Sequence, residues 1–172
     1  MEPRGSAWWR PQAWPRDVQC AVALMVVVAS LGGWATDIGP WYFSLAQPAW
    51  KPPDAWFGPV WMVLYVTTAW AGVRTWRRMP AAAGPARSGF VLVCLLHALL
   101  NVLWSVLYFT LRRPDWALVE GVALWLTAAW AARLMSRVDR LSGLLMLPLL
   151  LWLAVAWALN AATVWLNPPF GA

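Results

Sequence analysis

Long apolar stretches with almost no charge alternate along this chain with short charged segments. Glu120 is the only charged residue inside these stretches, which cover residues 18–36, 55–73, 88–111, 116–132 and 141–172. An α-helix needs about 20 mostly apolar residues to cross the hydrocarbon core of a bilayer. The pattern therefore predicts an all-α integral membrane protein, a bundle of five transmembrane helices with no soluble domain.

The spacing of the charged segments sets the expected limits of the elements. Helices are predicted at about residues 18–34, 55–76, 88–111, 116–135 and 141–166, with a proline, Pro148, inside the last one. This gives a membrane domain over residues 18–167, a polar lead-in over residues 1–17 and a carboxyl-terminal tail over residues 168–172.

The connection between the first two helices is the longest and has an unusual composition. It contains Gly39-Pro40-Trp41-Tyr42 and then Gln47-Pro48-Ala49-Trp50-Lys51-Pro52-Pro53. Proline fixes φ and removes an N–H donor, which favours a structured loop over a helix. Long loops in compact proteins are often lids or binding loops, so this segment is a candidate lid.

Composition and charge agree with a membrane protein. Hydrophobic residues make up 62% of the chain, charged residues 12%, and the mean hydropathy is +0.56. The net charge of +6 does not form one patch that would suit a nucleic acid. Ten of the 13 basic residues fall on one side of the expected bundle, namely Arg4, Arg10, Arg16, Arg74, Arg77, Arg78, Arg87, Arg133, Arg137 and Arg140. In a cytoplasmic membrane, the positive-inside rule then places the amino terminus in the cytoplasm.

Three expected helices carry aromatic and polar residues at helical spacing. These stripes are Trp61, Tyr65, Thr68 and Gly72; then His97, Asn101, Trp104 or Ser105, and Tyr108; then Trp152, Ala156, Asn160 and Thr163. Residues three or four apart share a helix face, and polar side chains in membranes turn away from lipid. The stripes are consistent with a ligand pocket or with hydrogen bonds between helices.

Single polar residues leave further alternatives open. His97, the only histidine, is a candidate haem ligand or a hydrogen-bonded packing residue, and no haem attachment motif accompanies it. Glu120 is either functional or neutralised by Arg112 or Arg113. Cys20 and Cys94 have no metal or disulfide spacing. Spacing alone predicts no metal site and no arrangement of a classical enzyme.

Tryptophan is unusually frequent, with 17 residues. Many can lie at the membrane interfaces, where indole rings concentrate. Seven instead fall inside the apolar stretches, at Trp61, Trp70, Trp104, Trp125, Trp130, Trp152 and Trp157. We expect rings of this kind to face inward, around a ligand that is flat, aromatic and apolar.

The first loop and the next helix carry a recognisable motif. Trp41-Tyr42-x-x-Leu45-x-x-Pro48-x-Trp50-x-Pro52-Pro53 precedes Phe57-Gly58-Pro59-Val60-Trp61 and Leu64-Tyr65. Further matches are Asn101 and Trp104, then Arg113-Pro114 with Ala117-Leu118, and Leu147-Pro148-x-x-x-Trp152 with Ala158-Leu159-Asn160. Over residues 18–167 the chain resembles the tryptophan-rich sensory protein family, also called the translocator protein or peripheral benzodiazepine receptor family.

The resemblance implies a five-helix bundle, often a homodimer, with a pocket closed by the first loop. It implies porphyrin ligands such as protoporphyrin IX or haem, besides sterols and isoquinoline or benzodiazepine drugs, and no required cofactor. By position, Trp61 and Trp152 look like the pair linked to porphyrin binding and its light-dependent breakdown, and Lys51 is a candidate for binding a propionate. With the stripes, the candidate ligand-binding residues are Tyr42, Trp50, Trp61, Tyr65, His97, Asn101, Trp104, Gly121, Trp152, Ala156 and Asn160.

The expected function is that of a membrane receptor or carrier for tetrapyrroles, regulating tetrapyrrole or stress responses. The alternatives are a light-dependent porphyrin-degrading enzyme that uses the same pocket, with Trp61 and Trp152 as its catalytic candidates, and a passive transporter. Sterol binding is doubtful, because the segment Ala161-Ala-Thr-Val-Trp165-Leu-Asn lacks the tyrosine and basic residue of the family's sterol motif.

Overall fold

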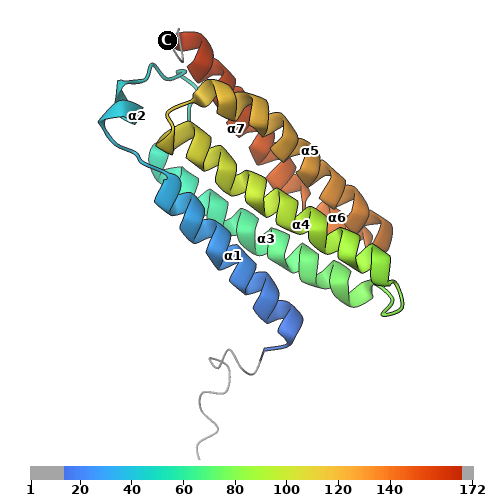
Figure 1. Ribbon diagram of the computed structural model, residues 1–172. Coiled ribbons are helices and arrows are strands. Elements are labelled where there is room, and N and C mark those ends of the chain that lie inside the picture. Colours follow the sequence, from blue (N-terminus) through green and yellow to red (C-terminus); the bar gives the residue numbers. More distant parts are fainter. Residues whose placement is uncertain (1–13, 168–172) are drawn as a thin grey trace, which may run out of the picture.

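The computed structural model describes residues 14–167 as a bundle of long helices, with no β-strand in that part of the chain (Figure 1). In chain order the elements are α1 (Arg16–Ala35), α2 (Pro40–Ser44), a 3₁₀ turn (Asp54–Trp56), α3 (Phe57–Arg78), α4 (Gly84–Ser105), a π-helical turn (Val106–Thr110), α5 (Pro114–Val138), α6 (Arg140–Leu144) and α7 (Leu147–Leu166). The all-α prediction is confirmed. Most of the expected lead-in and all of the expected tail lie outside the described residues.

Most of the long helices have the length and composition of membrane spans. The segments that qualify are Arg16–Ala35, Gly84–Thr110, Pro114–Val138 and Arg140–Leu166. The remaining long helix, α3, has 22 residues and a lower hydropathy because it is rich in tryptophan, threonine, glycine and arginine. α3 packs against α1, α5, α6 and α7, so it completes a five-segment bundle of a multi-pass membrane protein.

The fifth predicted helix is two helices in the structure. α6 and α7 are separated by a turn at Leu145 and Met146, and Pro148 lies in the first turn of α7. A proline is tolerated there because its missing N–H would have no helical partner in any case. The span expected over residues 141–166 is present as Arg140–Leu166, but it is not one continuous helix, because a turn at Leu145 and Met146 interrupts it.

The long helices form a ring. α1 contacts α3 and α4, α4 contacts α5, α5 contacts α7, and α3 closes the ring against α6 and α7. α5 has the most buried residues, and many of them are small, including Ala117, Ala128 and Ala131. Small side chains let neighbouring helices approach closely, as is common in membrane bundles.

The predicted lid is structured, as expected, and it contains the short helix α2. Pro40 occupies the first position of α2, so the expectation that this segment is not helical is wrong. The buried Tyr42 hydroxyl donates to Asp54 Oδ1 (2.7 Å), and Lys51 Nζ lies 2.5 Å from the same oxygen. At the other side, Asn167 exchanges two hydrogen bonds with the backbone of Ala46. The lid is thus attached to the end of α7, as Figure 1 shows.

Burial and the polar contacts of Asp54 keep Tyr42 protonated and Asp54 ionised. Burial, and then the hydrogen bond to Asp54, raises the pKa of Tyr42. Burial alone would raise the pKa of Asp54, but hydrogen bonds from Lys51 and Tyr42 outweigh it and hold that pKa below its ordinary value. The phenol therefore donates and the carboxylate accepts at neutral pH.

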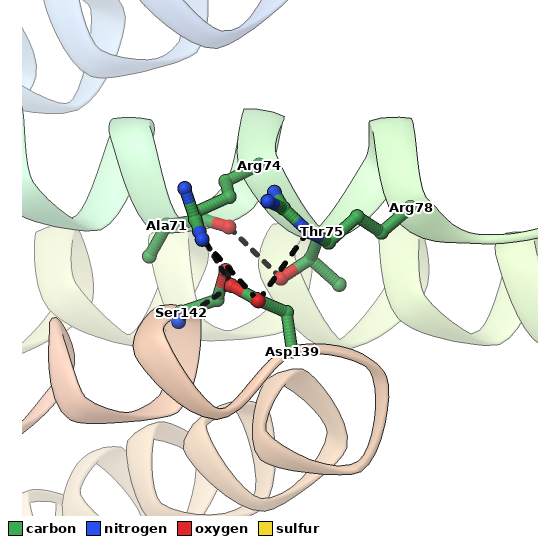
Figure 2. A network of polar contacts seen from close by, with 6 residues as sticks. All are labelled: Ala71, Arg74, Thr75, Arg78, Asp139 and Ser142. Carbon is green, nitrogen blue, oxygen red and sulfur yellow. Dashed lines mark hydrogen bonds and ion pairs between the residues drawn. The ribbon is translucent and has the colours of Figure 1, made fainter.

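A polar network joins α3 to the turn between α5 and α6 at the opposite end (Figure 2). Asp139 caps α6 by accepting from the Ser142 backbone N–H and hydroxyl. Arg74 Nε lies 2.5 Å and Arg78 Nε 3.3 Å from the Asp139 carboxylate oxygens. This is the basic end of the bundle, which also holds the Asp17–Arg77 pair between α1 and α3.

Acid is expected to weaken the bundle through Asp139. Its hydrogen bonds with Arg74 and then Ser142 hold the pKa of Asp139 well below its ordinary value. Such a group contributes stability that is complete above the unfolded-state pKa of about 4 and is lost as the pH falls toward the folded-state value. Thermal unfolding of the purified protein in detergent, followed by circular dichroism, should therefore show a Tm that falls below about pH 4.

The control for this prediction is Asp139→Asn. We expect this variant to have a lower Tm at neutral pH and a smaller further loss in acid, because the titrating group is gone. An Asp139→Asn Tm that falls with acid as steeply as that of the unaltered protein would show that other carboxylates cause the loss.

Candidate functional site

A cavity of about 540 Å³ lies between α1, α3 and α4. α5 and the start of α7 close its far side with Ala131, Met135, Met146 and Leu149. Its walls are almost entirely apolar, so it suits a hydrophobic ligand. Pockets for small molecules commonly have volumes of about 300–1,000 Å³, and this one lies within that range.

The stripe expected on α3 lines the cavity along its whole length, with Trp61, Tyr65, Thr68 and Gly72. Trp61 and Tyr65 form a continuous aromatic wall, with ring centroids 5.4 Å apart and planes inclined by 31°. The Tyr65 hydroxyl donates to Asn101 Oδ1 on α4 (3.1 Å). Because this bond uses the amide oxygen, the Asn101 NH₂ group keeps its donors for other partners.

The stripe expected on α4 divides between the cavity and a packed aromatic cluster. His97 and Asn101 line the cavity. Trp104 instead stacks on Tyr108, with ring centroids 5.1 Å apart, and meets Phe109 edge to face. This half of the stripe packs among aromatic rings, which is neither the expected pocket nor the hydrogen bonding between helices that was the alternative.

Gly121 also belongs to this packing region. A Cβ atom built at Gly121 would lie 3.0 Å from Trp157 Cδ1 and 3.7 Å from Trp104 Nε1. Trp157 Nε1 donates to the Leu118 carbonyl on the same helix as Gly121 (3.0 Å). The glycine thus lets two indole rings approach the α5 backbone, and it does not line the cavity.

The stripe expected on α7 faces the interior but lies outside the cavity. Trp152 meets Phe57 edge to face with ring centroids 5.5 Å apart, and its Nε1 is buried without a hydrogen-bond partner among the described residues. Asn160 is 1% exposed, and neither of its amide atoms has a partner there. Ala156, half-buried, lies between them on the same face. The roles expected for these three residues stay predictions.

The lid residues do not reach the cavity either. Tyr42 is committed to Asp54, and Trp50 in the lid is 55% exposed. Lys51 is paired with Asp54, so the cation expected to meet a propionate is already neutralised. Arg16, at the basic end, lines the cavity and has no acidic partner among the described residues.

Several tryptophans expected to face inward lie on the outer surface. Trp70, Trp125, Trp130 and Trp157 are 56%, 37%, 54% and 40% exposed, so the expectation is wrong for them. Among the seven, only Trp61 lines the cavity. Side chains on the outer face of the bundle meet lipid, where an indole ring is well accommodated.

The inner face of α1 is the part of the site that the sequence did not reveal. Cys20, Leu24 and Val28 line the cavity at helical spacing. After Arg16 and Asp17 at its start, the polar residues of α1 are Gln19 and Ser30, and neither of them lines the cavity. The lining residues are spaced four apart in the sequence, but most residues between them are apolar too, so the spacing does not distinguish the inner face of α1.

Glu120 does not form the ion pair with Arg112 or Arg113 that was one of its expected roles. Both carboxylate oxygens of Glu120 are buried without a partner within residues 14–167, and the expected neighbour Arg113 pairs with Asp115 instead (2.5 Å). Arg112 lies against the Trp41 ring. Across residues 14–167, no three His, Cys, Asp or Glu side chains gather closely enough to hold a metal ion by themselves.

Comparison with known proteins gives a consistent match over the helical bundle. The sequence pattern of the TspO/MBR family matches residues 21–166. The chain is 31% identical over 133 residues to the tryptophan-rich protein TspO of Chlorobaculum tepidum, covering 74% of this chain and 80% of the relative. It is 33% identical to the protein CrtK of Rhodobacter capsulatus, covering 76% and 80%, and 33% identical to the translocator protein of Sus scrofa, covering 78% and 82%.

Proposed function

The chain belongs to the TspO/MBR family, and we propose that it is a membrane receptor or carrier that binds porphyrins, protoporphyrin IX or haem, in the cavity between α1, α3 and α4. The observation that carries the proposal is the aromatic wall of Trp61 and Tyr65 beside the Asn101 amide. A porphyrin is flat, aromatic and apolar, with two carboxylates at one edge. The homodimer and the cytoplasmic amino terminus stay predictions.

Stacking on the aromatic wall accounts for recognition of the flat macrocycle. Aromatic faces prefer offset stacking, which contributes about 0.5–1.5 kcal/mol beyond burial of area. The NH₂ group of Asn101 supplies a donor at the edge of this wall. The rest of the cavity is apolar, so it binds through burial of hydrophobic surface.

The position of Arg16 indicates how the porphyrin is oriented. Arg16 is the cation that lines the cavity without an acidic partner among the described residues, whereas Asp17 pairs with Arg77. Arginine binds carboxylates through charge-assisted hydrogen bonds. The propionates therefore point to the basic end of the bundle and the macrocycle extends toward Trp61.

Replacing Trp61 with leucine is expected to weaken protoporphyrin IX binding. The substitution keeps an apolar side chain but removes the flat face, and the loss of about 0.5–1.5 kcal/mol corresponds to a roughly two- to tenfold higher Kd. Titration of the purified protein in nanodiscs, followed by quenching of tryptophan fluorescence, measures this change.

Trp130→Leu is the matched control, because Trp130 is on α5, 54% exposed, and does not line the cavity. It should leave the Kd unchanged. Absence of saturable quenching in the unaltered protein would refute porphyrin binding altogether. Equal effects of the two substitutions would refute the placement of the porphyrin against Trp61. Light-dependent degradation and passive transport, which share these residues, stay predictions.

A further inference from the structure

His97 lines the cavity and also contacts the neighbouring helix α5. It lies on α4, one turn before Asn101, and is the only histidine of the chain. Its ring reaches across to α5, where Nδ1 lies 3.4 Å from the hydroxyl oxygen of the buried Thr127. One edge of the imidazole is therefore held by a neighbouring helix while the residue borders the cavity.

The hydrogen bonds around Thr127 assign the proton of this ring. The Thr127 hydroxyl donates its single proton to the Leu124 carbonyl (2.9 Å). Toward His97, the hydroxyl oxygen can therefore only accept. The Leu124 carbonyl, which also lies near the ring, can likewise only accept. The proton accordingly lies on Nδ1, and Nε2 carries a free lone pair.

This arrangement is the one that metal-binding histidines show. A histidine ligand typically donates its second ring N–H to a carbonyl, carboxylate or other acceptor, which fixes the tautomer and the ring orientation. Among the described residues, the side chains that face the cavity include no group of three His, Cys, Asp or Glu that could hold a bare ion. A metal that arrives already bound in a flat macrocycle needs only one such ligand from the protein.

We propose that His97 Nε2 is an axial ligand of the iron of haem bound in the cavity, and that Thr127 is the residue that positions it. The inference rests on the proposed porphyrin binding and selects iron-loaded over metal-free porphyrin. The step is a single coordinate bond, in which the Nε2 lone pair binds the iron and the proton stays on Nδ1.

The position of His97 along the bundle axis fits the porphyrin orientation that we derived from Arg16. α1 and α4 run side by side, and the Thr110 hydroxyl donates to the Ala35 carbonyl at the far end of both (3.0 Å). At 1.5 Å of rise per residue, this register puts Arg16 roughly 9 Å closer to the basic end than His97. A propionate and an arginine side chain together cover that span. Iron at His97 and propionates at Arg16 therefore belong to one pose.

Cys94 on the same helix and Cys20 on α1 are the competing ligands, since both border the same cavity. A cysteine ligates as the thiolate, and an apolar wall disfavours that charged form. Histidine ligates as the neutral imidazole and needs no charge separation. The two ligands give distinct absorption and electron paramagnetic resonance spectra, so experiment separates them.

Because His97 is the only histidine of the chain, labelling histidine labels this residue alone, and the proposal can be tested directly in the unaltered protein. The chain is purified with a tag that contains no histidine, labelled with ¹⁵N-histidine, and titrated with ferric haem in nanodiscs. We expect hyperfine coupling between the iron and labelled nitrogen, which only His97 can supply. A spectrum without this coupling, or one with the signature of a thiolate ligand, overturns the proposal.

Variants and a metal-free control complete the test. His97→Ala should weaken haem binding about tenfold or more and remove the nitrogen ligand, while changing the Kd for protoporphyrin IX by less than about threefold. Added imidazole should restore the ligation spectrum of this variant. Thr127→Val, which keeps the volume and removes the acceptor, should weaken haem binding by about tenfold.

The two proposals fail in distinguishable ways. If protoporphyrin IX does not bind to the unaltered protein, the proposed function fails. If protoporphyrin IX binds but haem gives the same spectrum and Kd with and without His97, only the axial ligation fails.

Discussion

Replacing Gly143 with alanine is expected to destabilise the bundle by about 3 kcal/mol. A Cβ atom built at Gly143 would lie 1.8 Å from Ser136 Oγ, 2.8 Å from its Cβ and 3.0 Å from its Cα. Rotation of the serine could move Oγ, at the loss of its hydrogen bond to the Ala132 carbonyl, but it cannot move Cα. The steric cost exceeds the gain of about 1 kcal/mol that alanine brings to a helix over glycine.

The cause of this contact is the very short connection between two helices. α5 ends at Val138 and α6 begins at Arg140, so α6 folds back against the last turn of α5 around Asp139 alone. Gly143 is buried where the two helices cross. Any added side chain would push α6 away and break the capping bonds between Asp139 and Ser142.

A second substitution identifies the steric origin of the effect. Ser136→Gly removes the two closest atoms, so Gly143→Ala combined with Ser136→Gly should recover much of the lost stability. Gly89→Ala on α4 is the matched control, because its Cβ would meet nothing within 4 Å, and it should leave the Tm unchanged or raise it slightly. Thermal unfolding in detergent measures all four proteins. A Gly143→Ala Tm equal to that of the unaltered protein would disprove the clash.

Much of the fold follows from the sequence because membrane spans have a strong physical signature. Charge-free runs of the length of a bilayer predict helices, since only helices and closed barrels satisfy the backbone inside lipid. Interruptions within a membrane span are less predictable than the span itself. Pro148 marks the start of α7, yet the same residue is compatible with a kinked continuous helix, and only contacts with neighbouring helices decide between the two.

The candidate site was predictable in part, and the reason differs from helix to helix. On α3, a stripe from Trp61 to Gly72 marked the face that lines the cavity. The α7 stripe also identified a face that points into the bundle. Periodicity, however, does not show whether such a face lines a cavity or packs against another helix. Trp152 meets Phe57 at the start of α3, and Asn160 is buried outside the cavity. On α1, the faces differ too little in polarity for the sequence to indicate which one lines the cavity. Arg16 was used only to predict the orientation of the chain in the membrane.

Filling the cavity from Gly72 is expected to abolish porphyrin binding and leave the fold intact. Gly72 lines the cavity from the middle of α3, and a Cβ atom built there would meet nothing within 4 Å. A phenylalanine at this position extends into the space between α1, α3 and α4 without a clash at its base. We expect Gly72→Phe to raise the Kd for protoporphyrin IX at least about 100-fold, which corresponds to about 2.7 kcal/mol.

A graded series separates occlusion of the cavity from damage to the helix. Gly72→Ala, Gly72→Leu and Gly72→Phe should weaken binding in order of side-chain volume, while Tm stays constant or rises because glycine is the poorest of the four in a helix. Gly33→Phe is the control, since Gly33 is exposed on α1, outside the cavity, with nothing within 4 Å of its Cβ. If Gly72→Phe folds and still binds with an unchanged Kd, the ligand lies elsewhere. The α7 face with the unpaired polar atoms of Trp152 and Asn160 would then be the place to locate it.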